Sequence, residues 1–112
     1  MRILVCGGRD YSDREKLTAV LKEYICDDLT IIQGGARGAD ELALKWAEAF
    51  GVARITFPAH WEKYGKRAGY IRNVEMLNEG DPDLVIAFPG GKGTQMMITL
   101  AEAANVKVRK VE

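Results

Sequence analysis

Apolar and polar positions follow two alternating periods along the chain. The first segment, residues 3–6, is apolar throughout and ends at a glycine pair, which is typical of a strand buried on both faces. The last segment alternates Val with Lys and Arg, as a strand with one exposed face does. The predicted strands cover residues 3–6, 29–32, 53–57, 84–88 and 106–111.

Between these strands, apolar residues recur three and four positions apart, which predicts amphipathic helices. Ser12 or Asp13 is the expected N-cap of the first helix, whose apolar stripe extends to Ile25. Gly51 is the expected stop of the second helix. A polar, aromatic loop is expected at residues 59–68. The later helices are expected at about 38–50, 69–78 and 94–104.

The order of these elements predicts an α/β fold of the Rossmann-like type. Strict alternation of strands and helices implies a parallel sheet with helices on both faces, in three α/β/α layers. We expect a single domain over residues 1–112, with about five strands in the order 3-2-1-4-5. The reversal between the first and fourth strands opens a crevice at the carboxyl ends of the strands, where such folds bind ligands.

The charge balance and the few cysteine and histidine residues argue against several classes of function. Lys plus Arg and Asp plus Glu each number 16, so the zero net charge gives no reason to expect general nucleic-acid binding. Cys6 and Cys26 are interpreted as reduced, packed thiols. Because His60 is the only histidine, we expect no metal site, and no cofactor is expected either. The N-terminal apolar run is too short for a signal peptide or a membrane span, so we expect a cytoplasmic protein.

Glycine pairs follow three of the predicted strands, at Gly7–Gly8, Gly34–Gly35 and Gly90–Gly91. Glycine lets a ligand approach the backbone closely. Each pair also precedes a predicted helix, whose first N–H groups are free and carry a partial positive charge. Three such loops at one sheet edge favour an anion site, usually for phosphate, over three unrelated tight turns. Neither a Walker A nor a GxGxxG pattern is present.

Polar side chains cluster at the same predicted edge. Arg37 and Lys92 suit phosphate, and Thr94 is expected either to cap its helix or to donate to phosphate. Asp40 is expected to bind ribose hydroxyls, to act as a catalytic carboxylate, or only to place a favourable charge at a helix start. The candidate ligand-binding residues are Gly7, Gly8, Arg9, Asp10, Gly34, Gly35, Arg37, Gly38, Asp40, Trp61, Lys66, Arg72, Asn73, Gly90, Gly91, Lys92, Gly93 and Thr94.

The third helix and the loop before it supply some of these candidates. Arg72 and Glu75 are three residues apart, so they share a helix face. They either form a surface ion pair or enter the crevice, with Arg72 on a phosphate or sugar and Glu75 on a ribose. Tyr70 is expected to point toward the core. Trp61, or Tyr64 in the same loop, is expected to stack on a base, and packing in the core is the alternative for Trp61.

Five motifs run in order through nearly the whole chain: GGRD (7–10), QGGARGAD (33–40), FPAHW (57–61), GKRAGYIRNVEML (65–77) and PGGKGT (89–94). In this combination they resemble the YspA-type branch of the SLOG superfamily, which includes SMF/DprA-like proteins and the Lonely Guy enzymes. The resemblance implies a Rossmann-like fold that binds nucleotides or nucleotide derivatives. Lonely Guy enzymes are phosphoribohydrolases, which cleave the N-glycosidic bond of nucleoside 5′-monophosphates.

The match to the Lonely Guy signature is partial. Arg72 and Glu75 keep the helix motif and PGGKGT keeps the loop, but Met97 stands where these enzymes carry a catalytic glutamate. Glycosidic cleavage builds oxocarbenium character, which a carboxylate stabilises and a methionine cannot. If the chain is an enzyme, we therefore expect Arg72 to act with Asp40, Glu75 or Asp10.

Three functions are compatible with these residues. The favoured one is a binding module that senses or sequesters a nucleotide-derived signal. The second is a hydrolase of the phosphoribohydrolase type. The third is DNA binding, by analogy with DprA-like relatives, and depends on the basic residues Lys63, Lys66 and Arg67. We also expect a homodimer or higher homo-oligomer, in which the helix of Trp46 and residues 96–98 bury an apolar face. Met97 itself is expected either at that interface or in the core.

Overall fold

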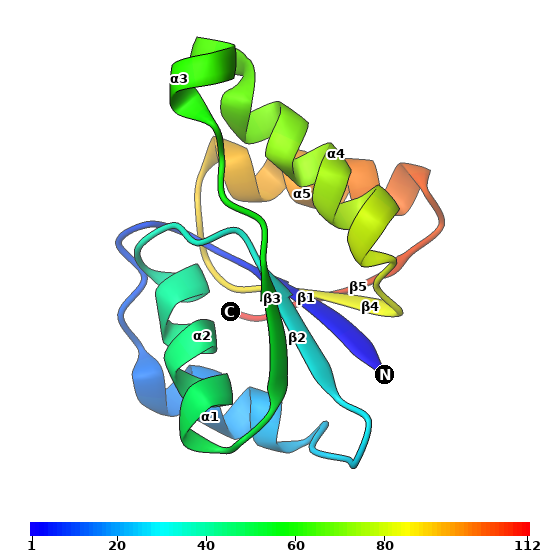
Figure 1. The fold of residues 1–112 in the computed structure, drawn as a ribbon. Coiled ribbons are helices and arrows are strands. Elements are labelled where there is room, and N and C mark those ends of the chain that lie inside the picture. The colour runs from blue at the N-terminus through cyan, green and yellow to red at the C-terminus, as the bar shows by residue number, and fades with distance from the viewer.

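A five-stranded parallel sheet runs through the middle of the molecule, with helices on both faces (Figure 1). The computed structural model describes residues 1–112. The strand order is β3-β2-β1-β4-β5, so the predicted Rossmann-like fold and its strand order are confirmed. The elements are β1 (Arg2–Cys6), α1 (Arg14–Lys22), β2 (Thr30–Gln33), α2 (Ala39–Ala49), β3 (Ala53–Thr56), α3 (Trp61–Tyr64), the 3₁₀ turn η1 (Gly65–Arg67), α4 (Ala68–Gly80), β4 (Leu84–Ala87), α5 (Lys92–Ala103) and β5 (Lys107–Lys110).

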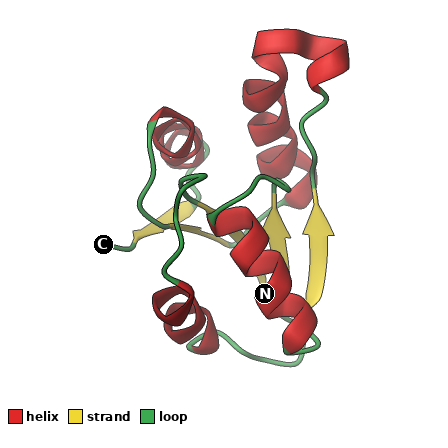
Figure 2. Cartoon of the chain, turned by 90° about the vertical axis from the view of Figure 1, so that its left-hand side faces the viewer, coloured by secondary structure: helices red, strands yellow, loops and turns green.

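The central strand β1 separates two hydrophobic cores. Helices α1 and α2 cover one face of the sheet and α4 and α5 cover the other (Figures 1 and 2). Successive side chains of a strand point to opposite faces. Accordingly, Ile3 and Val5 pack with α1 and α2, whereas Leu4 and Cys6 pack with α4 and α5. This explains why the first apolar run has no polar position.

The strand pairing brings three loops to one edge of the sheet. Leu4 of β1 pairs with Ile32 of β2 on one side and with Val85 of β4 on the other. Because the strands are parallel, the loops that follow β1, β2 and β4 leave the sheet together. The short helix α3 stands beyond the same edge, at the start of α4 (Figure 2). This is the edge at which the sequence predicted a ligand crevice.

Two of these glycine loops pack directly on the first one. The N–H of Gly8 donates to the Pro89 carbonyl at 2.9 Å, and the Gly8 carbonyl accepts from the N–H of Ala39 at 3.2 Å. A Cβ added at Gly7 would lie 2.6 Å from Ala39 Cβ. The glycines therefore serve close packing between loops, and the first N–H of α2 is already bonded to protein.

Several element boundaries differ from the prediction. Asp13 is the N-cap of α1, with its Oδ1 accepting from the Lys16 N–H at 3.0 Å, but α1 ends at Lys22 and Ile25 is exposed. Helix α5 begins at Lys92 after Gly91, so the capping role predicted for Thr94 is wrong. A capping side chain belongs to the residue before the first helical turn, and Thr94 lies within that turn.

The segment predicted as a loop at residues 59–68 contains α3 and η1. Its apolar residues are too few and too local to show a helical period, which explains why the pattern missed these two short elements. Gly51 follows the end of α2 with φ +66°, so its predicted role as a helix stop is confirmed.

The side chains expected to form an oligomer surface lie mostly in the core. Trp46 is 4 % exposed, Met97 1 % and Ile98 6 %. These three side chains pack in the cores of their own chain, so they cannot contact a second copy of the protein. Apolar residues at helical spacing can face either the core or a partner molecule. Only the packing shows that these three face the core.

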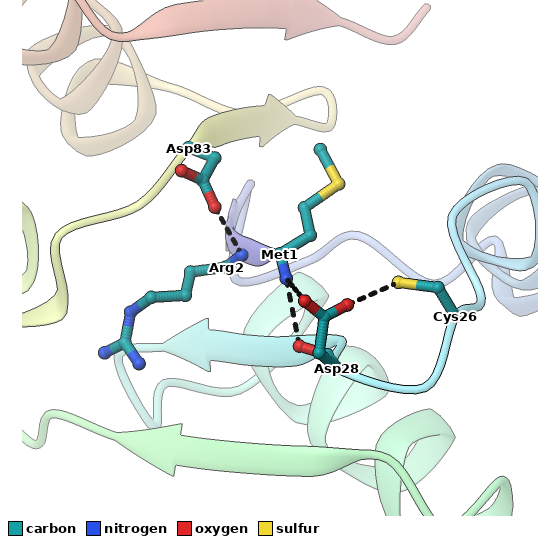
Figure 3. Close-up of polar contacts among 5 residues, drawn as sticks. All are labelled: Met1, Arg2, Cys26, Asp28 and Asp83. Carbon is teal, nitrogen blue, oxygen red and sulfur yellow. Dashed lines mark hydrogen bonds and ion pairs between the residues drawn. The ribbon is translucent and has the colours of Figure 1, made fainter.

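Acidic side chains bind the backbone at the start of β1 (Figure 3). This end of β1 lies opposite the end that leads into the glycine loops. The N–H of Arg2 donates to Asp83 Oδ2 at 2.8 Å, and the Met1 ammonium lies 3.1 Å from Asp28 Oδ2. The Cys26 thiol donates to Asp28 Oδ1 at 3.2 Å. Both cysteines are free, but only Cys6 is buried, so the prediction that Cys26 is packed is wrong.

Replacing Gly38 with Ala should destabilise the fold strongly. Gly38 has φ +83°, and an added Cβ would overlap the carbonyl of Gly8 and lie 2.6 Å from that of Arg9. Gly51→Ala is the matched control, because Gly51 also has a positive φ but nothing lies within 4 Å of an added Cβ. In urea denaturation we expect a loss of about 1 kcal/mol for Gly51→Ala and about 3 kcal/mol or more for Gly38→Ala. Equal losses would mean that the loop packing relaxes without cost.

Candidate functional site

A hollow of about 470 Å³ opens at the carboxyl ends of the strands, and we call it the main hollow. Its walls come from the loop after β1, the start of α2, the α3–α4 segment and the first turn of α5. The volume lies within the range of small-molecule sites. Four separate segments of the chain thus contribute to one cavity.

Asp40 and Arg72 hold the same peptide segment from two helices. Asp40 Oδ2 accepts from the N–H groups of Gly34 at 3.2 Å and Ala36 at 3.3 Å. Arg72 Nη1 donates to the Gly34 carbonyl at 2.7 Å. A Cβ at Gly34 would lie 2.8 Å from Arg72 Cζ, so a larger residue there would displace the guanidinium. Helices α2 and α4, on opposite faces of the sheet, are therefore connected through the loop after β2.

Asp40 is a buried carboxyl, 7 % exposed, and its surroundings shift its pKa. Burial raises the pKa of its carboxyl from 3.8 to about 6, against the opposing effects of the Ala36 N–H and of the Arg72 charge. A carboxyl in a cavity that titrates near neutral pH is typical of functional sites. Asp40 can therefore exchange a proton under physiological conditions.

Arg72 also fixes the orientation of Asn73. Its Nε donates to Asn73 Oδ1 at 3.0 Å, and because arginine only donates, the amide oxygen has to face it. The amide nitrogen then points the other way, with Met96 Sδ, a weak acceptor, 3.8 Å distant. Asn73 is 6 % exposed and lines the main hollow, so it offers the cavity a hydrogen-bond donor with no strong partner.

Two half-exposed aromatic side chains line the main hollow. Trp61 is 49 % exposed and Tyr70 46 %. The Arg9 guanidinium lies 5.9 Å from the centre of the Trp61 ring. The core positions considered for Trp61 and expected for Tyr70 are wrong, because both residues lie beyond the sheet edge, where no core is available to them. Exposed aromatic rings beside a cavity are suited to stacking on a planar ligand.

Cys6 and Met97 line the main hollow where it meets the core. Burial raises the pKa of the Cys6 thiol to about 12, so it stays protonated at neutral pH and is not a nucleophile. Met97 packs in the core with Met76. The position that carries glutamate in the Lonely Guy signature is therefore a buried apolar side chain here.

The main hollow brings together most of the predicted ligand residues, namely Gly7, Gly8, Arg9, Asp40, Trp61, Lys66, Arg72, Asn73, Gly91, Gly93 and Thr94. A second hollow adjoins the main one, and we call it the side hollow. It is lined by Gly34, Gly35 and Arg37, among others. Asp10, Gly38 and Gly90 line shallower depressions beside the first loop. Lys92 and Glu75 line neither hollow, and Glu75 forms no ion pair with Arg72.

Sequence reasoning missed several residues of the main hollow, including Tyr70, Met76 and Met96. A signal for two of them was available. Tyr70, Asn73 and Met76 are spaced three residues apart, so they follow one another along a face of α4. Accepting Asn73 as a ligand residue would have predicted its neighbours on that face. Met96 has no such signal, because it comes from another helix.

Neither a metal centre nor a membrane segment is evident. No group of three or more His, Cys, Asp or Glu side chains lies close enough together to hold a metal ion. None of the helices has the length and apolar character that crossing a bilayer requires.

Comparisons with known proteins agree with this architecture. Residues 1–64 match the sequence model of the family described as YspA, cpYpsA-related SLOG. Gene 61 protein of Mycobacterium phage D29 is 37 % identical over 117 residues, covering 96 % of this chain and 93 % of the phage protein.

A solved structure shares the fold. The crystal structure of UDP-GlcNAc 2-epimerase from Neisseria meningitidis bound to UDP-GlcNAc superposes with a TM-score of 0.57 at 18 % identity. All of this chain is covered, but it spans only 32 % of the epimerase chain. At this identity the similarity supports the Rossmann-like fold alone.

Replacing Asp40 with Asn should stabilise the protein at neutral pH. Because the folded pKa of Asp40 lies above its ordinary value, the folded state holds this proton more tightly, and stability falls as pH rises from about 4 to about 6. Asparagine keeps an oxygen that can accept from Gly34 and Ala36 but carries no charge. We expect a gain on the order of 2 kcal/mol at pH 7.5 that disappears near pH 4, measured by urea denaturation. A loss at pH 7.5 would show that the ionised carboxylate stabilises the fold through Arg72.

Proposed function

The chain belongs to the YspA, cpYpsA-related SLOG family, and from that premise we propose that it binds a nucleotide or nucleotide-derived small molecule in the main hollow. One observation carries the proposal. The cavity combines half-exposed aromatic rings with an amide donor that has only a weak acceptor, on a fold whose ligands bind at this edge. That combination suits a molecule with a planar base at one end and an anion at the other.

The base is proposed to lie against Trp61 and Tyr70, because aromatic rings stack on any base. Asn73 is proposed to donate to an oxygen or ring nitrogen of the ligand. The anionic end is proposed to meet Arg9 and the first turn of α5, where Gly93 and Thr94 lie. The first N–H groups of a helix have no intrahelical acceptor and favour negative charge.

Binding, as a sensor or sink for a nucleotide signal, is the favoured function. Met97 is 1 % exposed and apolar, so the loop glutamate of the phosphoribohydrolase signature has no equivalent at that position. Without that group, a ligand held by the hollow is expected to remain intact. Cytoplasmic location and self-association as a homodimer or higher oligomer stay predictions, and sedimentation velocity would measure the second.

Stacking can be tested with matched aromatic variants. Purified protein is first mixed with nucleosides and nucleoside mono- and diphosphates of the four common bases, and retained compounds are identified by mass spectrometry. For a retained compound, Trp61→Ala and Tyr70→Ala should each weaken binding about tenfold or more in calorimetry. Phe50→Ala is the control, since Phe50 is 47 % exposed and lines neither hollow.

Unchanged affinity in both the Trp61 and Tyr70 variants would contradict the placement of the base. A Phe50→Ala loss of the same size would show that the effect is not specific to the hollow. If no compound of the panel is retained, the nucleotide proposal itself fails.

A hydrolase is the second candidate, and Asp40 is the observation that favours it. Its carboxyl lines the main hollow and titrates near neutral pH, so it is the best placed group to stabilise an oxocarbenium-like state or to prepare a water. Arg72, beside it, would hold the sugar or phosphate.

Turnover would be measured as free base released from nucleoside 5′-monophosphates. Asp40→Asn should abolish release while the variant still binds substrate, because only the acid–base group is lost. Glu75→Gln is the control, because Glu75 lies outside the main hollow. Continued release by Asp40→Asn would eliminate Asp40 from the reaction, and absence of release by the unmodified protein would leave binding as the function.

A further inference from the structure

The side hollow, which adjoins the main hollow, has a volume of about 420 Å³. It is bounded by the loop after β2 and by Pro58 and Ala59, which follow β3. Three arginines line it, Arg9, Arg37 and Arg72, and no acidic residue does. In a chain whose charges balance overall, this is a local concentration of positive charge.

The two hollows share a wall. Arg9, Ala36, Trp61 and Arg72 line both of them. A molecule seated in the main hollow can therefore continue past Trp61 and Arg72 into the side hollow without leaving the surface of the protein. From the main hollow toward the side hollow, such a molecule would meet the aromatic rings and the Asn73 amide first and the Arg37 guanidinium last.

The charges of the side hollow are poorly compensated by the protein. Arg72 uses Nη1 on the Gly34 carbonyl and Nε on the Asn73 amide oxygen, both neutral acceptors. Burial lowers the pKa of Arg72, the Asp40 charge opposes this, and the neighbouring Arg9 adds to the lowering. Arg37 meets only Asp10, at 3.4 Å, with the side chains 70 % and 97 % exposed. Such an exposed pair contributes little and exchanges readily for a better anion.

Gathering like charges in one place costs stability unless an anion neutralises them. Guanidinium groups bind phosphate oxygens in pairs of parallel hydrogen bonds, so a phosphate is the anion that suits three arginines best. Arg37 lines the side hollow but not the main hollow. A phosphate bound in the main hollow would therefore leave Arg37 free for a second anionic group of the same ligand.

We infer that the ligand carries two consecutive phosphates, as nucleoside 5′-diphosphates and their esters do, with the distal phosphate in the side hollow on Arg37 and Arg9. This inference rests on the proposed function, since the base and the first phosphate occupy the main hollow. Arg37 is then the residue that distinguishes a diphosphate from a monophosphate.

The test compares matched ligands and matched charge variants. Affinities of AMP, ADP, GMP, GDP, UMP, UDP, CMP and CDP are measured by calorimetry for the unmodified protein, Arg37→Gln and Arg54→Gln. Arg54 is the control, because it is an arginine of the edge strand β3 that lines neither hollow. Circular dichroism checks that each variant is folded.

For the base that binds best, the unmodified protein should prefer the diphosphate over the monophosphate by about ten- to a hundredfold. Arg37→Gln should reduce this preference to threefold or less, with monophosphate affinity almost unchanged, and Arg54→Gln should keep it. Inorganic pyrophosphate should compete with the diphosphate more strongly than inorganic phosphate does.

Four results would overturn the inference. Equal affinity for mono- and diphosphate, or an equal loss of both in Arg37→Gln, would show that no second phosphate is recognised, while binding of the monophosphate would leave the proposed function intact. Tighter binding of a short single-stranded oligonucleotide than of any diphosphate would assign the arginines to nucleic acid. Binding of none of these compounds would overturn both proposals together.

Discussion

Both backbone polar groups of Gly34, its N–H and its carbonyl, are hydrogen-bonded to side chains, and the arrangement of the site depends on these two bonds. Asp40 of α2 accepts its N–H and Arg72 of α4 donates to its carbonyl. The two helices lie on opposite faces of the sheet, so the loop after β2 is the physical link between them. The same contacts bury a carboxyl beside a guanidinium at the floor of a cavity. Under the proposed function, the atoms that link the two helices would also be those that meet the ligand.

The glycines in these loops allow the loops to pack closely against one another. The backbone of Gly8 bonds to Pro89 and to Ala39, so the loops after β1, β2 and β4 brace one another. Such contact is possible only where side chains are missing. Because the Ala39 N–H is already bonded to Gly8, the proposed anion site is at the first turn of α5 and the guanidinium groups rather than at all three loops equally. The two adjoining hollows and their shared wall of Arg9, Trp61 and Arg72 follow from this arrangement.

Much of the fold could be read from the sequence, because its determinants are periodic and local. The wholly apolar run of β1 required a strand between two helical layers, and strict alternation of elements required parallel pairing. Asp40 could be singled out because its motif lies between a strand end and a helix start, and Arg72 and Asn73 because they belong to a helix motif that resembles the family's. The short helix α3 and the true start of α5 were not recoverable, since a single turn has too few residues to show a period.

The sequence by itself determined the layers, the strand order and the edge at which polar residues gather. Only the tertiary structure decided which of those residues share a cavity. It placed Trp61 and Tyr70 beside the main hollow, turned Met97 into the core and left Glu75 outside. The reason is physical: periodicity fixes which face of an element is buried, but the neighbours of a side chain across the sheet edge depend on how separate elements pack. The raised pKa of Asp40 and the Asn73 amide nitrogen, whose one acceptor is the weak Met96 Sδ, arise only from that packing.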